Sequence, residues 1–221
     1  IAEILCEIAR ELRRLPWALQ VYRLRSHLQK APPLLRSIRS AELTEHLFNL
    51  LLTLGTAGET STRQMSRRLG ANLDRLAIPE AQRLAFFDEL EDIGLVYTEF
   101  RTSERTHQKW KLTQWAQDMT AEAFAHHLCK TCDDPFPLLS TLCPAYQAAV
   151  VALAPYREQR FLDATLALRP MSPVALGILL QRIAANSLPA VYDETLKRLG
   201  QMDLSPWLAK TLADAARAQG L

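Results

Sequence analysis

Glycine is scarce in this chain, with 7 in 221 residues, and long apolar runs are absent. Low glycine together with 48% apolar residues predicts a packed, helix-rich globular protein and excludes a disordered chain. No apolar run approaches the ~20 residues that a membrane-spanning helix needs. Glu3, Glu7 and Glu11 interrupt the apolar positions near the N-terminus, so we expect no signal peptide there. These absences predict a soluble intracellular protein, cytoplasmic or, in a eukaryote, nuclear.

Motifs that carry catalysis are also missing. The sequence contains no phosphate-binding glycine loop, no Gly-x-Ser-x-Gly and no His-Glu-x-x-His. A site assembled from residues scattered along the chain would not be visible in this way. We therefore expect a non-enzymatic protein that uses no cofactor.

Cysteine is rare as well, and the four cysteines are Cys6, Cys129, Cys132 and Cys143. A chain of this length can build a core that needs no disulfides, so free thiols in a reducing compartment are expected. The segment "HHLCKTC" (126–132) contains Cys-x-x-Cys, a common half of a zinc site. Only Cys143 follows, so the second half of such a site is missing. We predict buried thiols and a histidine pair at a helix end, without a bound metal.

Acidic residues are missing from residues 12–40, although the net charge of the whole chain is only +2. The basic residues of this stretch are Arg13, Arg14, Arg23, Arg25, Lys30, Arg36 and Arg39. Such a polarised stretch predicts a surface for phosphates or for an acidic partner. A solvated face of an ordinary protein is the alternative.

Most of the remaining sequence has the apolar spacing of amphipathic helices. Two prolines in "APPLL" (31–35) predict a break, and "GTAGETST" (55–62) predicts a loop. Ser61 or Thr62 is expected to cap the next helix, with Gly70 and Gly94 as helix stops. The predicted helices cover residues 1–15, 17–30, 41–54, 62–70, 78–94, 113–128, 144–153, 155–168, 173–185, 189–199 and 206–218.

One stretch departs from the helical pattern. "LVYTEF" (95–100) is rich in β-branched and aromatic residues, and "QKWKL" (108–112) alternates charged and apolar side chains. This alternation places Trp110 and Leu112 on one face of a strand and the two lysines on the other. The stretch predicts a two-stranded hairpin with a polar loop.

The two sides of this hairpin carry a resemblance to a known family. In "FFDELEDIGLVYTEF" a helix closes on a glycine and runs directly into a strand, and in "KWKLTQWAQDM" the second strand passes through Leu-Thr into a helix. Residues 41–128 therefore resemble the winged-helix domain, a helix-turn-helix variant with a β-hairpin wing. The resemblance implies a winged-helix domain over 41–128. With the charge pattern before it and the helical pattern after it, the sequence predicts a mainly α fold with a basic lead-in segment (1–40), a central winged-helix domain (41–128) and a C-terminal helical bundle (129–221). The resemblance also implies that the third helix enters the major groove of DNA and that the wing contacts the backbone or minor groove.

The resemblance and the basic residues together predict a surface that holds DNA phosphates. Asp88, Glu89, Glu91 and Asp92 crowd the third helix and would repel phosphates, which leaves its start as the place for base contacts. Such a surface requires the lead-in segment, the second helix and the wing to share one face. The predicted DNA-binding residues are Arg63, Arg67 and Arg68 on the second helix, Gln82 and Arg83 as base readers, Arg101, Arg105, Lys109 and Lys111 on the wing, and Arg13, Arg14, Arg23 and Arg25 before the domain.

Two functions are compatible with these patterns. The first is a non-enzymatic DNA-binding protein, such as a regulator or a component of chromosome or plasmid maintenance. The alternative is a protein-interaction scaffold within a larger complex that does not bind DNA directly. Phe86 and Phe87 are adjacent, so one of them should point away from the core of the domain. We expect both to pack against a neighbouring domain; the alternative is an exposed protein-binding patch. A protein partner or self-association is compatible with both functions.

Overall fold

The computed structural model describes residues 16–38, 40–98, 108–167, 171–202, 210 and 213. The chain forms two compact units, Ile1–His126 and His127–Leu221. Within the described residues it is mainly helical and contains a three-stranded antiparallel sheet, which confirms the mainly α fold class. The predicted helix over 1–15 and nearly all of the one over 206–218 lie outside the described residues.

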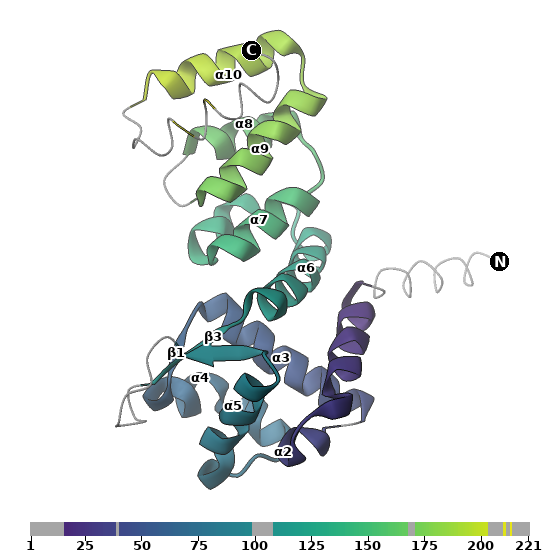
Figure 1. The fold of residues 1–221 in the computed structure, drawn as a ribbon. Coiled ribbons are helices and arrows are strands. Elements are labelled where there is room, and N and C mark those ends of the chain that lie inside the picture. Colours follow the sequence, from purple (N-terminus) through teal and green to yellow (C-terminus); the bar gives the residue numbers. More distant parts are fainter. Residues whose placement is uncertain are drawn as a thin grey trace, which may run out of the picture. The chain divides into compact units, whose positions relative to one another are not determined.

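The first unit begins with a helix over 16–27, which matches the predicted helix over 17–30. Figure 1 labels most of the elements that follow it. In chain order they are η1 (Leu28–Lys30), α2 (Pro33–Arg36), α3 (Ala41–Ala57), β1 (Thr60–Ser61), α4 (Thr62–Arg75), η2 (Glu80–Gln82), α5 (Arg83–Asp92), β2 (Val96–Thr98), β3 (Lys109–Leu112) and α6 (Gln114–Thr131).

The sheet contains the predicted hairpin and one further strand. β2 and β3 pair antiparallel, with Val96 opposite Leu112, which confirms the two strands on either side of the polar loop. β1 pairs with the other edge of β3, so the strand order is β1-β3-β2. The sequence analysis assigned β1 to a loop. A strand of two residues carries no readable alternation, and its partner lies about 50 residues further along the chain.

Two helix ends differ from the predictions. α4 continues through Gly70 to Arg75 because the buried stripe of Met65, Leu69 and Leu73 extends past the glycine. The chain leaves the helix two residues later, at Ala77, which adopts the left-handed conformation with φ 55°. α5 begins at Arg83, after a 3₁₀ turn, rather than at Pro79.

Gly94 stops α5 as predicted. Its φ is 72°, and its N–H donates to the carbonyl oxygen of Glu91 over 2.9 Å. The N–H of Leu95 reaches back to the carbonyl oxygen of Leu90, also over 2.9 Å. These two bonds form a Schellman motif, in which glycine is favoured because it enters the left-handed region without a Cβ clash. The chain thus turns directly from α5 into β2.

The core of the first unit draws on both the basic lead-in segment and the helices that follow it. Trp110 of β3 is fully buried, with its ring centroid 5.3 Å from that of Phe87 on α5. Leu24, Leu35 and Ile38 belong to the same cluster of buried residues. Burial of a side chain of this size contributes about 1.5–3 kcal/mol, so residues 16–38 fold together with the rest of the unit.

Phe86 and Phe87 are both fully buried in the core of the first unit, so the alternative of an exposed protein-binding patch at these residues is wrong. α5 has packing partners on two sides. Phe87 packs towards the sheet through Trp110, while α2 contacts α5 through the carboxylate of Glu89. A helix covered on two sides can bury adjacent side chains, and neither phenylalanine is available as an exposed patch.

The second unit is a bundle of helices in which α9 contacts α7, α8 and α10. Pro144, Pro173 and Pro189 stand in the first turns of α7, α9 and α10, where a helix needs no backbone N–H donor. Four helices lie close to their predicted bounds: α7 (Pro144–Leu153), α8 (Glu158–Ala167), α9 (Pro173–Asn186) and α10 (Pro189–Gly200). The 3₁₀ helix η4 (Phe136–Thr141), which precedes them, was not predicted.

Arg182 on α9 closes the C-terminal end of α7. Its Nη1 donates to the carbonyl oxygens of Val151 (2.8 Å) and Ala154 (2.5 Å). Its guanidinium carbon lies 4.9 Å from the centroid of the Phe161 ring on α8. Burial lowers the pKa of Arg182. One side chain therefore ties three helices of the second unit together.

None of the helices within the described residues is long and apolar enough to cross a membrane.

Candidate nucleic-acid interface

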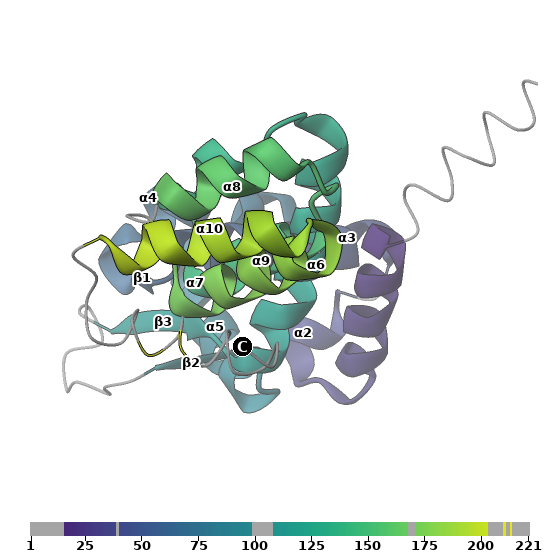
Figure 2. The same cartoon turned by 90° about the horizontal axis from the view of Figure 1, so that it is seen from above.

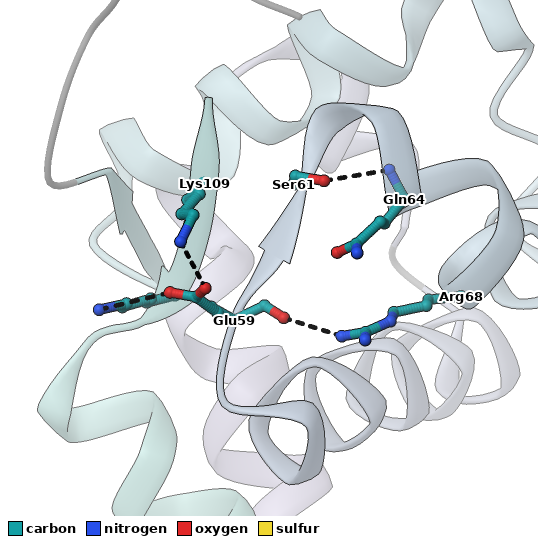
Figure 3. A network of polar contacts seen from close by, with 6 residues as sticks. Glu59, Ser61, Gln64, Arg68 and Lys109 are labelled. Atoms are coloured by element: carbon teal, nitrogen blue, oxygen red, sulfur yellow. Dashed lines mark hydrogen bonds and ion pairs between the residues drawn. The ribbon is translucent and has the colours of Figure 1, made fainter. Parts of the chain in front are cut away.

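Three basic side chains converge on Glu59, in the segment between α3 and β1 (Figure 3). Lys109 Nζ lies 2.7 Å from Glu59 Oε1, and Lys111 Nζ lies 3.7 Å from Glu59 Oε2. Arg68 Nη1 donates to the backbone carbonyl oxygen of Glu59 over 3.1 Å. We call these four residues the Glu59 cluster. The Glu59 cluster contains three cationic side chains and one carboxylate, so its formal net charge is +2.

The pairing of β1 with β3 positions the two lysines. Ser61 lies opposite Lys109, and Thr60 lies opposite the buried Trp110. Along β3 the buried residues alternate with Lys109 and Lys111, so both lysines share one face of the strand, as the sequence predicts. Trp110 therefore anchors the strand in the core, and the lysines stand on the side that faces Glu59.

α4 contributes further basic residues next to this cluster. Ser61 caps the helix by accepting a hydrogen bond from the N–H of Gln64 over 3.3 Å, as Figure 3 shows, which confirms one of the two predicted caps. Arg67 and Arg68 are exposed, on the side of α4 away from its buried stripe. The side chain of Arg63 lies outside the described part of the structure.

The charge of Glu59 decides how strongly the cluster attracts an anion. The pKa of Glu59 is lowered, mainly because Lys109 donates a hydrogen bond to its carboxylate; burial opposes the shift, and the charges of Lys109 and Lys111 add to it. Glu59 is therefore ionised at neutral pH. It neutralises part of the charge of the two lysines and occupies the space between them.

The two predicted base readers differ in their surroundings. Gln82 is exposed in the turn before α5. Arg83 is only 13% exposed, and its Nη2 lies 2.9 Å from Oδ1 of Asp74 on α4. This ion pair holds the guanidinium of Arg83 against the protein. The exposed surface at the start of α5 therefore carries the side-chain amide of Gln82 and no guanidinium that points into solvent.

Two carboxylates of α5 make contacts within the unit that the sequence analysis missed. Glu89 accepts hydrogen bonds from the N–H groups of Leu34 (3.2 Å) and Leu35 (2.9 Å) in the first turn of α2. Glu91 Oε1 accepts from both N and Oγ1 of Thr98 on β2, each over 3.3 Å. Glu89 and Glu91 therefore hold the unit together through hydrogen bonds, a role that the sequence analysis did not assign to them. Asp92 is exposed.

The described basic residues on the helix over 16–27 lie apart from the Glu59 cluster. Figures 1 and 2 place the helix over 16–27 and the β1–β3 edge on opposite sides of the first unit. Arg23 and Arg25 are exposed on that helix. The structure thus separates two basic surfaces where the sequence analysis required a single face. Four predicted DNA-binding residues, Arg13, Arg14, Arg101 and Arg105, lie outside the described residues.

The cysteine segment at the end of α6 shows ordinary helix-end contacts. Cys129, Cys132 and Cys143 carry free thiols, while Cys6 lies outside the described residues. Cys132 Sγ donates to the carbonyl oxygen of Asp134 over 3.1 Å, and burial raises the pKa of Cys129. Within the described part of the chain, no three histidine, cysteine or acidic residues are grouped in a way that could hold a metal ion.

Comparisons of the chain with protein-family models, with curated proteins and with solved structures gave no match.

Proposed function

We propose that residues 41–128 form a winged-helix domain and that this domain binds DNA through its phosphates. The fold proposal is supported by the order of α3, β1, α4, α5, β2 and β3 and by the pairing of β1 beside the hairpin. This order matches the helix-turn-helix variant with a wing that the sequence resembles. The protein would be a non-enzymatic regulator or a component of chromosome or plasmid maintenance.

The observation that carries the binding proposal is the net positive Glu59 cluster beside the exposed Arg67. Lys109 is 58% exposed, so its ammonium can exchange the Glu59 carboxylate for a phosphate oxygen. Each phosphate that a lysine or arginine neutralises releases counterions and adds about 0.9 to the slope of log affinity against log salt concentration. The cluster is therefore suited to binding that depends on salt.

Sequence-selective contacts have less support. Arg83 is paired with Asp74, and the exposed residues of α5 are Ala85 and Asp92. Neither side chain presents a cation to the major groove. We infer binding that relies on the backbone of the duplex and discriminates weakly between sequences.

The test is fluorescence anisotropy of a labelled random duplex at several salt concentrations. Replacing both Lys109 and Lys111 with alanine should weaken binding and reduce the salt slope by about 2. Glu59→Gln should strengthen binding, because it removes the anion that competes with phosphate. Lys197→Ala, which removes an exposed lysine from α10, is the matched control and should change nothing.

Two results would refute the proposal. One is an absence of binding by the native protein at low salt. The other is an unchanged salt slope in the double lysine variant.

The exposed face of α5 favours a second candidate, a protein-interaction scaffold. Gln82, Ala85 and Asp92 form an exposed surface without a cation, which suits a protein better than a phosphate backbone. Asp92→Lys reverses a charge there without touching the contacts of Glu89. Under this candidate the variant should lose a protein that co-purifies with the native chain, and an unchanged complex would count against it.

A further inference from the structure

A second basic surface lies on the helix over 16–27 and the residues that follow it, and it contains a cavity of about 450 Å³. The cavity is lined by Tyr22, Arg25, Ser26, Leu28, Gln29 and Ile38, which we call the Tyr22 groove. Leu28 and Ile38 are 3% and 1% exposed and belong to the core, so they form its apolar base. Tyr22 is 66% exposed, so its ring stands beside the cavity and is open to solvent.

The outer surface around the Tyr22 groove is positively charged. Residues 16–38 contain no aspartate or glutamate, and Arg23, Arg25, Lys30 and Arg36 are all exposed. Among the described residues, carboxylates on α5 and α6 contact this segment. Glu122 accepts from the buried Gln20 over 2.7 Å, and Glu89 accepts from backbone amides of α2. Both of these carboxylates hold the segment to the unit through hydrogen bonds to neutral groups.

We propose that the Tyr22 groove binds single-stranded nucleic acid, with a base stacked on the Tyr22 ring and the backbone held by Arg25 and its basic neighbours. Surfaces that hold single strands combine aromatic platforms with cations that follow the backbone. Ser26 and Gln29 supply hydrogen-bond donors and acceptors for the edge of an unpaired base. An acidic peptide would match the charge, but an exposed ring beside a partly polar cavity suits a flat, polar base better than a peptide side chain.

This proposal goes beyond the duplex binding proposed above and does not depend on it. The Tyr22 groove and the Glu59 cluster use different elements on opposite sides of the first unit (Figures 1 and 2). A protein with both surfaces could hold a duplex and an unpaired strand at the same time.

The experiment measures binding of a labelled oligothymidylate of about 10 nucleotides by fluorescence anisotropy. Tyr22→Ala should weaken binding roughly 5- to 150-fold, which corresponds to the loss of one stacked base. Tyr22→Phe retains the ring and should bind like the native protein. Arg25→Ala should lower the salt slope by about 0.7, the contribution of one phosphate on a single strand.

Two controls separate base stacking from charge. Tyr97→Ala removes another exposed tyrosine, which is 39% exposed on β2, and should leave binding of the single strand unchanged. An abasic strand of the same length has the same charge and no bases, so it should bind more weakly than oligothymidylate and should not respond to Tyr22→Ala.

Three outcomes would overturn the proposal. They are equal binding of the abasic strand, equal binding of the Tyr22→Ala variant, and binding of an oligoglutamate that depends on Tyr22 as strongly, which would indicate an acidic protein partner. The variant in which Lys109 and Lys111 are both alanine distinguishes the two sites. It should impair duplex binding and leave the Tyr22-dependent binding of the single strand intact.

Discussion

Glu89→Ala should destabilise the first unit, because Glu89 caps a helix that lies 54 residues earlier in the chain. α2 begins with Pro33, which has no N–H, so Leu34 and Leu35 carry the unpaired donors of its first turn. Glu89 accepts from both of them, over 3.2 Å and 2.9 Å. Leu35 is fully buried, so water cannot fully replace the lost acceptor at its amide.

The expected loss follows from these two hydrogen bonds. A hydrogen bond to a charged group contributes about 1.5–3 kcal/mol, and removal of an N-terminal cap costs about 0.5–2 kcal/mol. Glu89 is only half-buried, so solvent should recover part of the sum. We expect a decrease of about 2 kcal/mol in the free energy of unfolding. With a typical urea dependence, the unfolding midpoint should fall by about 1 M.

Urea unfolding followed by tryptophan fluorescence is a suitable assay. Trp17, Trp110 and Trp115, three of the four tryptophans, belong to the first unit, so the signal reports mainly on its unfolding. Asp92→Ala removes an exposed carboxylate from the same helix and should stay within about 0.5 kcal/mol of the native protein. If Glu89→Ala and Asp92→Ala had equal midpoints, the capping role of Glu89 would be wrong.

Three further predictions concern other parts of the fold. Gly70→Ala should stabilise the protein by about 0.5–1 kcal/mol in the same urea assay, because Gly70 lies inside α4 and an added Cβ would meet no atom within 4 Å; a lower midpoint would contradict this. Arg182→Met should cost about 2–4 kcal/mol, because the carbonyl oxygens of Val151 and Ala154 lose their donor; hydrogen exchange should show faster exchange in α7, and unchanged protection would refute the role of Arg182. Burial raises the pKa of Cys129, so at neutral pH its thiol should react with iodoacetamide more slowly in the native protein than in urea, as mass spectrometry can measure; equal rates would contradict its burial.

The sequence predicted those helix ends and strands that are set by residues within a few positions of one another. Prolines in the first turns of α9 and α10, and Gly94 after α5, act through backbone geometry alone. The alternation of lysines with Trp110 and Leu112 predicted which face of β3 is buried. The stop predicted at Gly70 was wrong, because a helical glycine costs only about 1 kcal/mol and the burial of Leu69 and Leu73 outweighs it.

The sequence predicted which basic residues belong to the candidate site, but it did not predict which residues they contact. The sequence showed that Arg67, Arg68, Lys109 and Lys111 are basic, but not that Lys109 and Lys111 pair with Glu59. It also gave no indication that Arg83 is held by Asp74. These partners approach one another only when the sheet and the helices assemble.

By itself, the sequence determined the helical class, the hairpin and the absence of acidic residues from residues 12–40, because periodicity, turn chemistry and charge are properties of neighbouring residues. Only the tertiary structure decided that Phe86 and Phe87 are both buried, that Glu89 caps α2, and that the two basic surfaces lie on opposite sides of the first unit. The physical reason is distance along the chain. A cap, an ion pair or a buried face made by residues about 50 positions apart depends on how helices pack, and no local pattern records that packing.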